Sequence, residues 1–473
     1  MTTGGGTPGL VYMVATVSAL GGLLFGYDTG IISGALIYLR QDLGLSSTGQ
    51  EVVVSVILVG AMAGAVLSGR LAVRYGRRRV VIVVGLVFAL GALGAAVAPG
   101  TGTLVVARFV LGLAVGGASN TVPVYIAEVA PAAIRGRLMV LFQLMVAIGQ
   151  LISYVCGWLF AGSGGWRVMF ALAMVPAVAL AVGMTFLPES PRWLVGQDRT
   201  GPARDVLRRL RPADADLDTE LAEIHQVTSA SETADWRELR KPWLRPALVV
   251  ALGVAAFSQL TGINAIVYYA PTILTDAGFG DSAALLTGIG IGSMLVIAGI
   301  TGALTVDKAG RRRTMLWFLP GSALAMTVLA LAFLGDGGTA QRWTVIIALF
   351  AYILCNGIGI QAVVWLIGPE VLPLSVRGPA TSLATLTLWG FDLLIALTAL
   401  SAVTAFGRTG TFLFYALMNV ACVVFVLFKV PETRGSSLEE IETALRRPGD
   451  FRHNLTGPPD AEAGGHLAEP RKR

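Results

Sequence analysis

The sequence predicts an all-α membrane protein with about twelve transmembrane helices in two six-helix bundles. Of the 473 residues, 55% are hydrophobic and only 14% are charged, whereas about a quarter of a soluble domain is charged. The mean hydropathy is +0.72. Apolar stretches of about 18 residues or more recur along the whole chain, and the second half repeats motifs of the first half in the same order.

Each expected span is long enough to cross about 30 Å of hydrocarbon. No cleavable signal peptide is expected, because the first apolar segment is too long and lacks a basic leader, so this segment should remain as the first helix. The expected spans run approximately over 10–39, 51–73, 80–98, 104–127, 138–161, 167–187, 246–275, 283–306, 314–335, 343–367, 379–403 and 410–430.

Basic residues crowd one set of connections between the spans. They follow the second span (Arg74 to Arg79) and the eighth (Lys308 to Arg313), and they are frequent in the connection 188–245. The positive-inside rule therefore places both termini in the cytoplasm. This topology also explains the basic balance of the chain, so no nucleic-acid partner is expected.

The internal repeat has a spacing of roughly 240 residues and indicates two bundles related by an axis along the membrane normal. We expect an N-terminal bundle over 1–187, a cytoplasmic helical linker over 188–245, a C-terminal bundle over 246–431 and a partly disordered cytoplasmic tail over 432–473. The repeated motifs are GRLAVRYGRRR and DKAGRRR, then EVAPAAIRG and EVLPLSVRG, then PESPR and PETRG.

The repeated charges are expected to lie at the cytoplasmic ends of the bundles. Each motif glutamate can pair with the arginine that follows it seven residues later, and several such pairs together can latch the two bundles in one state. A single water-exposed pair would contribute little. The alternative is that these charges only set topology and anchor lipid headgroups. The candidate latch residues are Arg77, Glu128, Arg135, Arg311, Glu370 and Arg377.

These motifs give the chain a clear resemblance to the sugar porter family of the major facilitator superfamily, over about residues 10 to 440. The resemblance implies the major facilitator fold, alternating access to a central sugar site, and no cofactor. Besides the repeats, it is carried by FGYDTGIISGAL, PVYIAEVAPAAIRGR, PESPRWL and QLTGINAIVYYAP.

One carboxylate, Asp28, stands alone in the first span, where an ionisable group costs about 2.5–3.5 kcal/mol even on lenient scales. Spans one and four can adjoin, so Arg108 can be its partner. The guanidinium favours the charged carboxylate and burial favours the neutral one, so the two effects together suit a proton carrier. The alternative is a static buried ion pair. The resemblance supports proton coupling, since proton-coupled members carry Asp here and facilitative relatives usually carry Asn.

Two amides in the seventh span suit a neutral ligand rich in hydroxyls. Gln259 and Asn264 would lie about 140° apart on an unbroken helix, but Gly262 between them permits a break that aims both at one cavity. The alternative is hydrogen bonding between helices. The resemblance favours sugar binding.

The resemblance also implies that Gln143 and Trp365 hold the sugar, and the face of Trp365 can pack on sugar C–H groups. Trp365 can instead be an interface anchor. Further candidates for walls or gates of the site are Phe25, Tyr268, Tyr269 and Trp389.

The chain departs from the family at Ser258 and Leu295, where relatives often have amides, and at Asp392, where Asn or Gln is common. The usual hexose contacts are thereby in doubt. Asp392 can be a direct acceptor for sugar hydroxyls, which we rank first, a second proton site, or a protonated structural residue.

The sequence thus predicts a monomeric sugar:proton symporter in the plasma membrane bilayer. A hexose such as glucose is the first candidate, with a pentose or inositol as alternatives. A facilitative uniporter and a transporter-like sugar receptor are the competing functions, although the tail is short for signalling. No enzyme is expected, because no nucleophile–base pair, metal-ligand cluster or nucleotide-binding loop is evident.

Glycines at four-residue intervals from Gly22 to Gly34 are expected to serve close helix packing.

Overall fold

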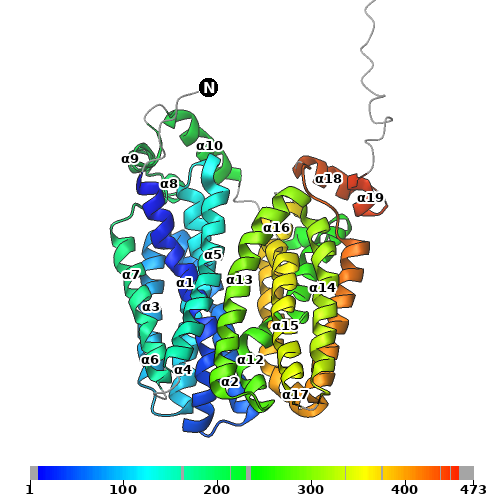
Figure 1. The fold of residues 1–473 in the computed structure, drawn as a ribbon. Helices are drawn as coiled ribbons and strands as arrows, with labels where there is room; N and C mark the ends of the chain where they lie inside the picture. Colours follow the sequence, from blue (N-terminus) through cyan, green and yellow to red (C-terminus); the bar gives the residue numbers. More distant parts are fainter. Residues whose placement is uncertain are drawn as a thin grey trace, which may run out of the picture.

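The protein is described by a computed structural model over residues 9–160, 165–212, 215–230, 236–335, 337–373, 376–436, 438–447 and 449–456. Throughout these residues the regular structure is helical, and the long helices stand side by side in two bundles (Figure 1). The first bundle consists of α1 (Gly9–Asp42), α2 (Ser47–Tyr75), α3 (Arg77–Ala96), α4 (Thr101–Val129), α5 (Ala132–Leu159), α6 (Trp166–Leu172) and α7 (Met174–Thr185). The second consists of α11 (Arg245–Leu260), α12 (Ile263–Asp276), α13 (Asp281–Ala309), α14 (Arg311–Ala332), α15 (Thr339–Asn356), the π-helical turn η5 (Gly357–Gln361), α16 (Ala362–Val371) and α17 (Arg377–Lys429).

The predicted number of spans is confirmed once α17 is divided. Eleven helices of the described chain are long and apolar enough to cross a membrane. A straight helix of the 53 residues of α17 would be about 80 Å long, far beyond about 30 Å of hydrocarbon. Gly407 interrupts it with φ 70° and ψ 169°, so α17 contains the last two spans on either side of one turn.

Close contact between α1 and α5 depends on the glycine stripe. A Cβ atom added to Gly26 would lie 1.8 Å from the carbonyl oxygen of Val146, and one added to Gly149 would lie 2.2 Å from that of Leu23. The two backbones therefore touch, which only residues without a side chain allow. The expected packing role of the stripe is confirmed at these positions.

The repeated motifs meet at one end of the bundles, which we call the arginine-rich rim because it carries Arg77–Arg79 and Arg311–Arg313. In the first bundle, Arg77 Nη2 lies 3.0 Å from Glu128, and the Ser190 hydroxyl donates to the same carboxylate at 2.5 Å. The Glu189 carboxylate accepts the backbone N–H groups of Arg77 and Arg78 at 2.9 and 3.0 Å. Glu189 thus offsets part of the positive charge of the first turn of α3, which carries three arginines next to the positive end of the helix dipole.

The second bundle repeats this arrangement with its own residues. Arg311 Nη2 lies 2.7 Å from Glu370, and the Thr433 hydroxyl donates to Glu370 at 2.6 Å. The Glu432 carboxylate accepts the backbone N–H of Arg311 at 2.8 Å, at the start of α14. Both motif glutamates therefore form ion pairs within their own bundle. The side chains of Arg135 and Arg377 lie outside the described residues, so their expected pairing stays a prediction.

Short helices cover the arginine-rich rim (Figure 1). Five short helices lie in the chain between α7 and α11: α8 (Pro191–Val195), α9 (Thr200–Leu210), α10 (Leu217–Ala230), η3 (Trp236–Arg240) and η4 (Pro242–Leu244). Two more follow α17: α18 (Leu438–Arg446) and α19 (Phe451–Thr456). α8 to α10 share a small core of their own that includes Leu194, Leu207 and Leu221. Arg211 attaches this group to the first bundle, because it pairs with Glu220 at 2.7 Å and donates to the Val129 carbonyl at 2.9 Å.

The C-terminal helices attach to the second bundle instead. The guanidinium of Arg446 on α18 lies 4.1 Å from the centre of the Trp243 ring in η4. Each bundle therefore carries its own set of helices at this rim, and the two sets can follow their bundles independently.

Candidate functional site: a buried ion pair beside a central cavity

Asp28 and Arg108 form the expected ion pair deep in the first bundle. Arg108 Nη1 lies 3.0 Å from Asp28 Oδ1 and 2.9 Å from Oδ2, joining α4 to α1. Arg108 is 1% exposed and Asp28 is 2% exposed, so water does not screen the pair. Arg108 Nε also donates to the carbonyl of Val53 on α2 at 3.2 Å. One guanidinium thus connects three helices.

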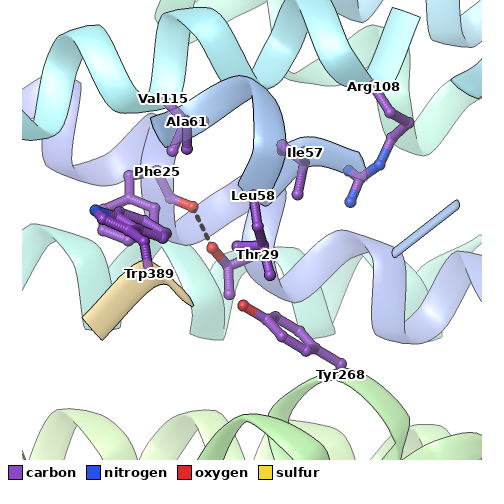
Figure 2. Close-up of a pocket in the computed structure, with 9 residues that line it drawn as sticks. All are labelled: Phe25, Thr29, Ile57, Leu58, Ala61, Arg108, Val115, Tyr268 and Trp389. Carbon is purple, nitrogen blue, oxygen red and sulfur yellow. Dashed lines mark hydrogen bonds between the residues drawn. The ribbon is translucent and has the colours of Figure 1, made fainter. Parts of the chain in front are cut away.

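A small cavity lies between the bundles next to this pair (Figure 2). The first bundle contributes Arg108 and Thr29, the residue after Asp28, and the second contributes Tyr268 and Trp389. The rings of Phe25 and Trp389 lie against each other at one side of it, with centroids 5.7 Å apart and planes tilted by 43°. The Tyr268 hydroxyl points toward Thr29 in Figure 2. The remaining lining residues are Ile57, Leu58, Ala61 and Val115.

Gly262 breaks the seventh span as predicted. Its φ of +93° separates α11 from α12, and the Asn264 amide donates to Gln259 Oε1 at 2.8 Å. The break leaves the Thr261 carbonyl without a helical partner, and this oxygen accepts from Tyr352 at 2.8 Å and from Asn419 at 3.0 Å. The broken segment is thus held firmly, and it brings the two amides together.

Asp392 continues this group of polar side chains. Its carboxylate accepts from the Tyr268 hydroxyl at 3.2 and 3.4 Å, and the Asn264 amide lies nearby. Asp392 is only 3% exposed. Gln259 and Asn264 therefore form one hydrogen-bonded pair, and Asp392 and Tyr268 form a second pair that reaches the cavity.

The other predicted sugar residues lie farther from the cavity. Tyr269 is fully buried and its hydroxyl donates to the Ala396 carbonyl at 2.6 Å, so it ties α12 to α17, whereas its neighbour Tyr268 lines the cavity. Gln143 on α5 and Trp365 on α16 are both exposed, Trp365 to 44%. Neither side chain touches the cavity in this state, and their expected role in sugar binding stays a prediction.

Sequence reasoning missed three residues that the structure brings to this region. Thr29 lines the cavity, and Gln361 in the π-helical turn donates to the Ser258 carbonyl at 2.7 Å, beside the amide pair. The sequence signal of Thr29 and Gln361 is weak, since each is a single uncharged polar residue in an apolar span. The third missed residue is Glu51.

Glu51 joins the two bundles at the rim opposite the arginines. Its carboxylate, on a residue only 1% exposed, accepts the backbone N–H of Ser401 at 2.7 Å and the Ser401 hydroxyl at 2.6 Å. Arg40 and Asp276 form a second, exposed bridge at 2.8 Å. Among the described residues, no hydrogen bond or ion pair joins the bundles at the arginine-rich rim. The cavity is therefore closed toward the opposite rim.

Two helical bundles with a central cavity and a buried ion pair define a membrane transporter. A family model described as sugar (and other) transporter matches residues 14–445. The chain is 40% identical to a glucose transporter of Staphylococcus epidermidis over 92% of this chain and 97% of that one. It is 35% identical to an arabinose-proton symporter of Bacillus subtilis over 92% and 95%.

Solved structures agree with these relatives. A partially occluded inward-open form of the xylose transporter XylE from E. coli superposes with a TM-score of 0.78 and 27% identity, over 91% of this chain and all of that one. A ligand-bound structure of the proton:xylose symporter XylE superposes with a TM-score of 0.75 and 28% identity, over 92% of this chain and 99% of that one. The chain therefore belongs to the sugar transporter family.

Proposed function

We propose that this protein imports a monosaccharide together with a proton across the plasma membrane by alternating access. The observation that carries the proposal is the Asp28–Arg108 pair, buried next to a cavity that both bundles line. A buried carboxylate whose arginine partner belongs to another helix can change its pairing when the helices move. Proton uptake can therefore be coupled to a change in which side of the membrane the cavity faces.

The names of the relatives support the substrate class. They include a glucose transporter, a D-xylose transporter, a myo-inositol transporter and an arabinose-proton symporter. The amides of Gln259 and Asn264 offer donors and acceptors for sugar hydroxyls, and the rings of Phe25 and Trp389 offer flat apolar faces. A hexose such as glucose is the first candidate, with a pentose or inositol next.

The proposed state of the structure is inward-facing. The positive-inside rule places the arginine-rich rim and both termini in the cytoplasm. Glu51 and Asp276 then close the external side, and the cytoplasmic side carries no bond between the bundles among the residues described. We propose that the protein works as a monomer in the lipid bilayer.

The driving force is sufficient. One charge that crosses about 150 mV gains about 3.5 kcal/mol. At about 1.4 kcal/mol per factor of ten, one proton supports a sugar gradient of about 300-fold. No bound cofactor is required for this coupling.

The test is Asp28→Asn in right-side-out vesicles that contain the purified protein. We expect this variant to lose accumulation against a gradient but to retain sugar counterflow, because the cavity persists without the proton carrier. Asp205→Asn removes an acid on α9 that is 72% exposed and serves as the matched control, with normal accumulation. Accumulation by Asp28→Asn would refute the proton assignment, and wild-type uptake that ignores a pH gradient would indicate a uniporter.

The sugar itself can be identified by competition. A panel of hexoses, pentoses and polyols should inhibit labelled uptake in proteoliposomes in order of affinity. Binding of sugar without any transport into the vesicles would instead indicate a receptor.

A further inference from the structure

Two carboxylates are buried near the central cavity, and they differ in how their charge is balanced. Asp28 has both oxygens within 3.0 Å of Arg108. Asp392 has only neutral partners, the Tyr268 hydroxyl and the Asn264 amide. Among the described residues, no basic side chain forms an ion pair with Asp392. A buried carboxylate without a cation costs several kcal/mol, so a bound proton is the simplest neutralising charge.

The surroundings of Asp392 leave few other sources of positive charge. The titratable groups that face it from α12 are Tyr268 and Tyr269. From the first bundle, Arg108 lines the same cavity but is already paired with Asp28, and Glu51 on α2 is an acid and offers no positive charge. The basic residues of the neighbouring helices α11 and α14, which are Arg245, Arg311, Arg312 and Arg313, stand at the helix ends.

A proton on Asp392 has a route to the cavity. Tyr268 contacts the carboxylate and also lines the cavity, and a phenol hydroxyl can both donate and accept. The bond from Tyr268 to Asp392 therefore places the acid one hydroxyl away from the space that opens to either side in turn.

The same acid is connected to the proposed sugar site. The Asn264 amide donates to Gln259 at 2.8 Å and lies near Asp392. A sugar that takes the Asn264 amide for itself would draw a polar group away from ionised Asp392. Binding of sugar would thus strengthen proton binding at Asp392, and loss of sugar would weaken it.

We propose that Asp392 is a second proton-binding group, loaded and unloaded in the same cycle as Asp28, so that two protons accompany each sugar. This inference rests on the proposed symport function and extends its stoichiometry. At about 150 mV, the second proton raises the sustainable sugar gradient from about 300-fold to about 10⁵-fold.

The ratio can be measured directly at zero net flux. Purified protein is reconstituted into liposomes with a tenfold gradient of labelled glucose or xylose, and the membrane potential is clamped at zero with potassium and valinomycin. The opposing pH gradient that stops net sugar movement is then found. For one proton per sugar the balance lies at about one pH unit, and for two protons at about half a unit.

We expect balance at about half a pH unit for the wild-type protein and for the Asp205→Asn control, and at about one unit for Asp392→Asn. Wild-type balance at one unit would overturn the proposal, as would an unchanged half-unit balance in Asp392→Asn. If Asp392→Asn does not fold, the balance point of the wild-type protein is sufficient to decide between one proton and two protons per sugar. Sugar movement that no pH gradient can stop would instead refute symport itself, which separates the two failures.

Discussion

Closure of the external side should depend mainly on Glu51. We expect Glu51→Ala to shift the transporter toward its outward-open state. The carboxylate accepts two hydrogen bonds from Ser401, at 2.7 and 2.6 Å, between residues of the two bundles. Alanine has no side-chain acceptor, so both bonds are lost.

The size of the shift follows from the two bonds. Each hydrogen bond contributes about 0.5–1.5 kcal/mol net, so the loss of both costs about 1–3 kcal/mol. This corresponds to an increase of about 5- to 150-fold in the ratio of outward-open to closed protein. Arg40→Gln breaks an exposed bridge whose side chains are 48% and 45% accessible, which is worth at most about 1 kcal/mol.

The assay uses a single reporter thiol at the cavity. Thr29→Cys is introduced after replacement of the native cysteines 156, 355 and 422, and a membrane-impermeant thiol reagent is added outside right-side-out vesicles. The labelling rate measures the outward-open population. We expect Glu51→Ala to be labelled faster than Arg40→Gln, with Ser401→Ala in between because it loses only the hydroxyl donor. Equal rates for Glu51→Ala and Arg40→Gln would refute the reasoning.

Three further predictions concern the architecture that supports the site. Gly262→Ala should weaken the apparent sugar affinity about 5- to 150-fold in counterflow, because alanine is strained at φ +93° and its Cβ would lie 2.7 Å from the Tyr415 ring. Gly390→Ala, which has open space around it, is the control. Gly26→Ala should lower the melting temperature by several degrees, since overpacking costs about 1–3 kcal/mol, and a stability equal to that of Gly299→Ala would contradict the backbone contact of α1 and α5. Asp216 precedes the first residue of α10, and hydrogen bonds from the side chain and the backbone of Thr219 hold its pKa below the usual 3.8. The stabilisation of the helix by ionised Asp216 should therefore be complete above pH 3.8 and should fall as the pH drops through the lowered pKa. Asp216→Ala should speed amide exchange in the first turn of α10 at neutral pH and leave little further change on acidification.

The sequence predicted the spans and the internal repeat well, because both depend on local quantities. An apolar run of membrane length admits few alternatives to a helix. The Asp28–Arg108 contact was also predictable, since these charges are isolated in their spans and a buried charge requires a partner.

What the sequence could not supply was the relative rotation and contact of helices. Tyr268 and Tyr269 are adjacent in the chain, yet one lines the cavity and the other bonds to α17, because successive residues of a helix point about 100° apart. Glu128 pairs with Arg77 because the end of α4 lies beside the start of α3, a fact that no local spacing contains. Glu51 resembled an ordinary helix-end charge until the second bundle was placed over it.

Arg108 bonds to two helices, and protonation of Asp28 would weaken only one of these contacts. One nitrogen of the guanidinium holds the Asp28 carboxylate and another holds the Val53 carbonyl, which cannot be protonated at physiological pH. When Asp28 becomes neutral, its attraction to the arginine weakens while the link between α4 and α2 persists. The contact between α1 and α4 is then the one that loosens, while α2 and α4 stay joined and α1 keeps its backbone contact with α5.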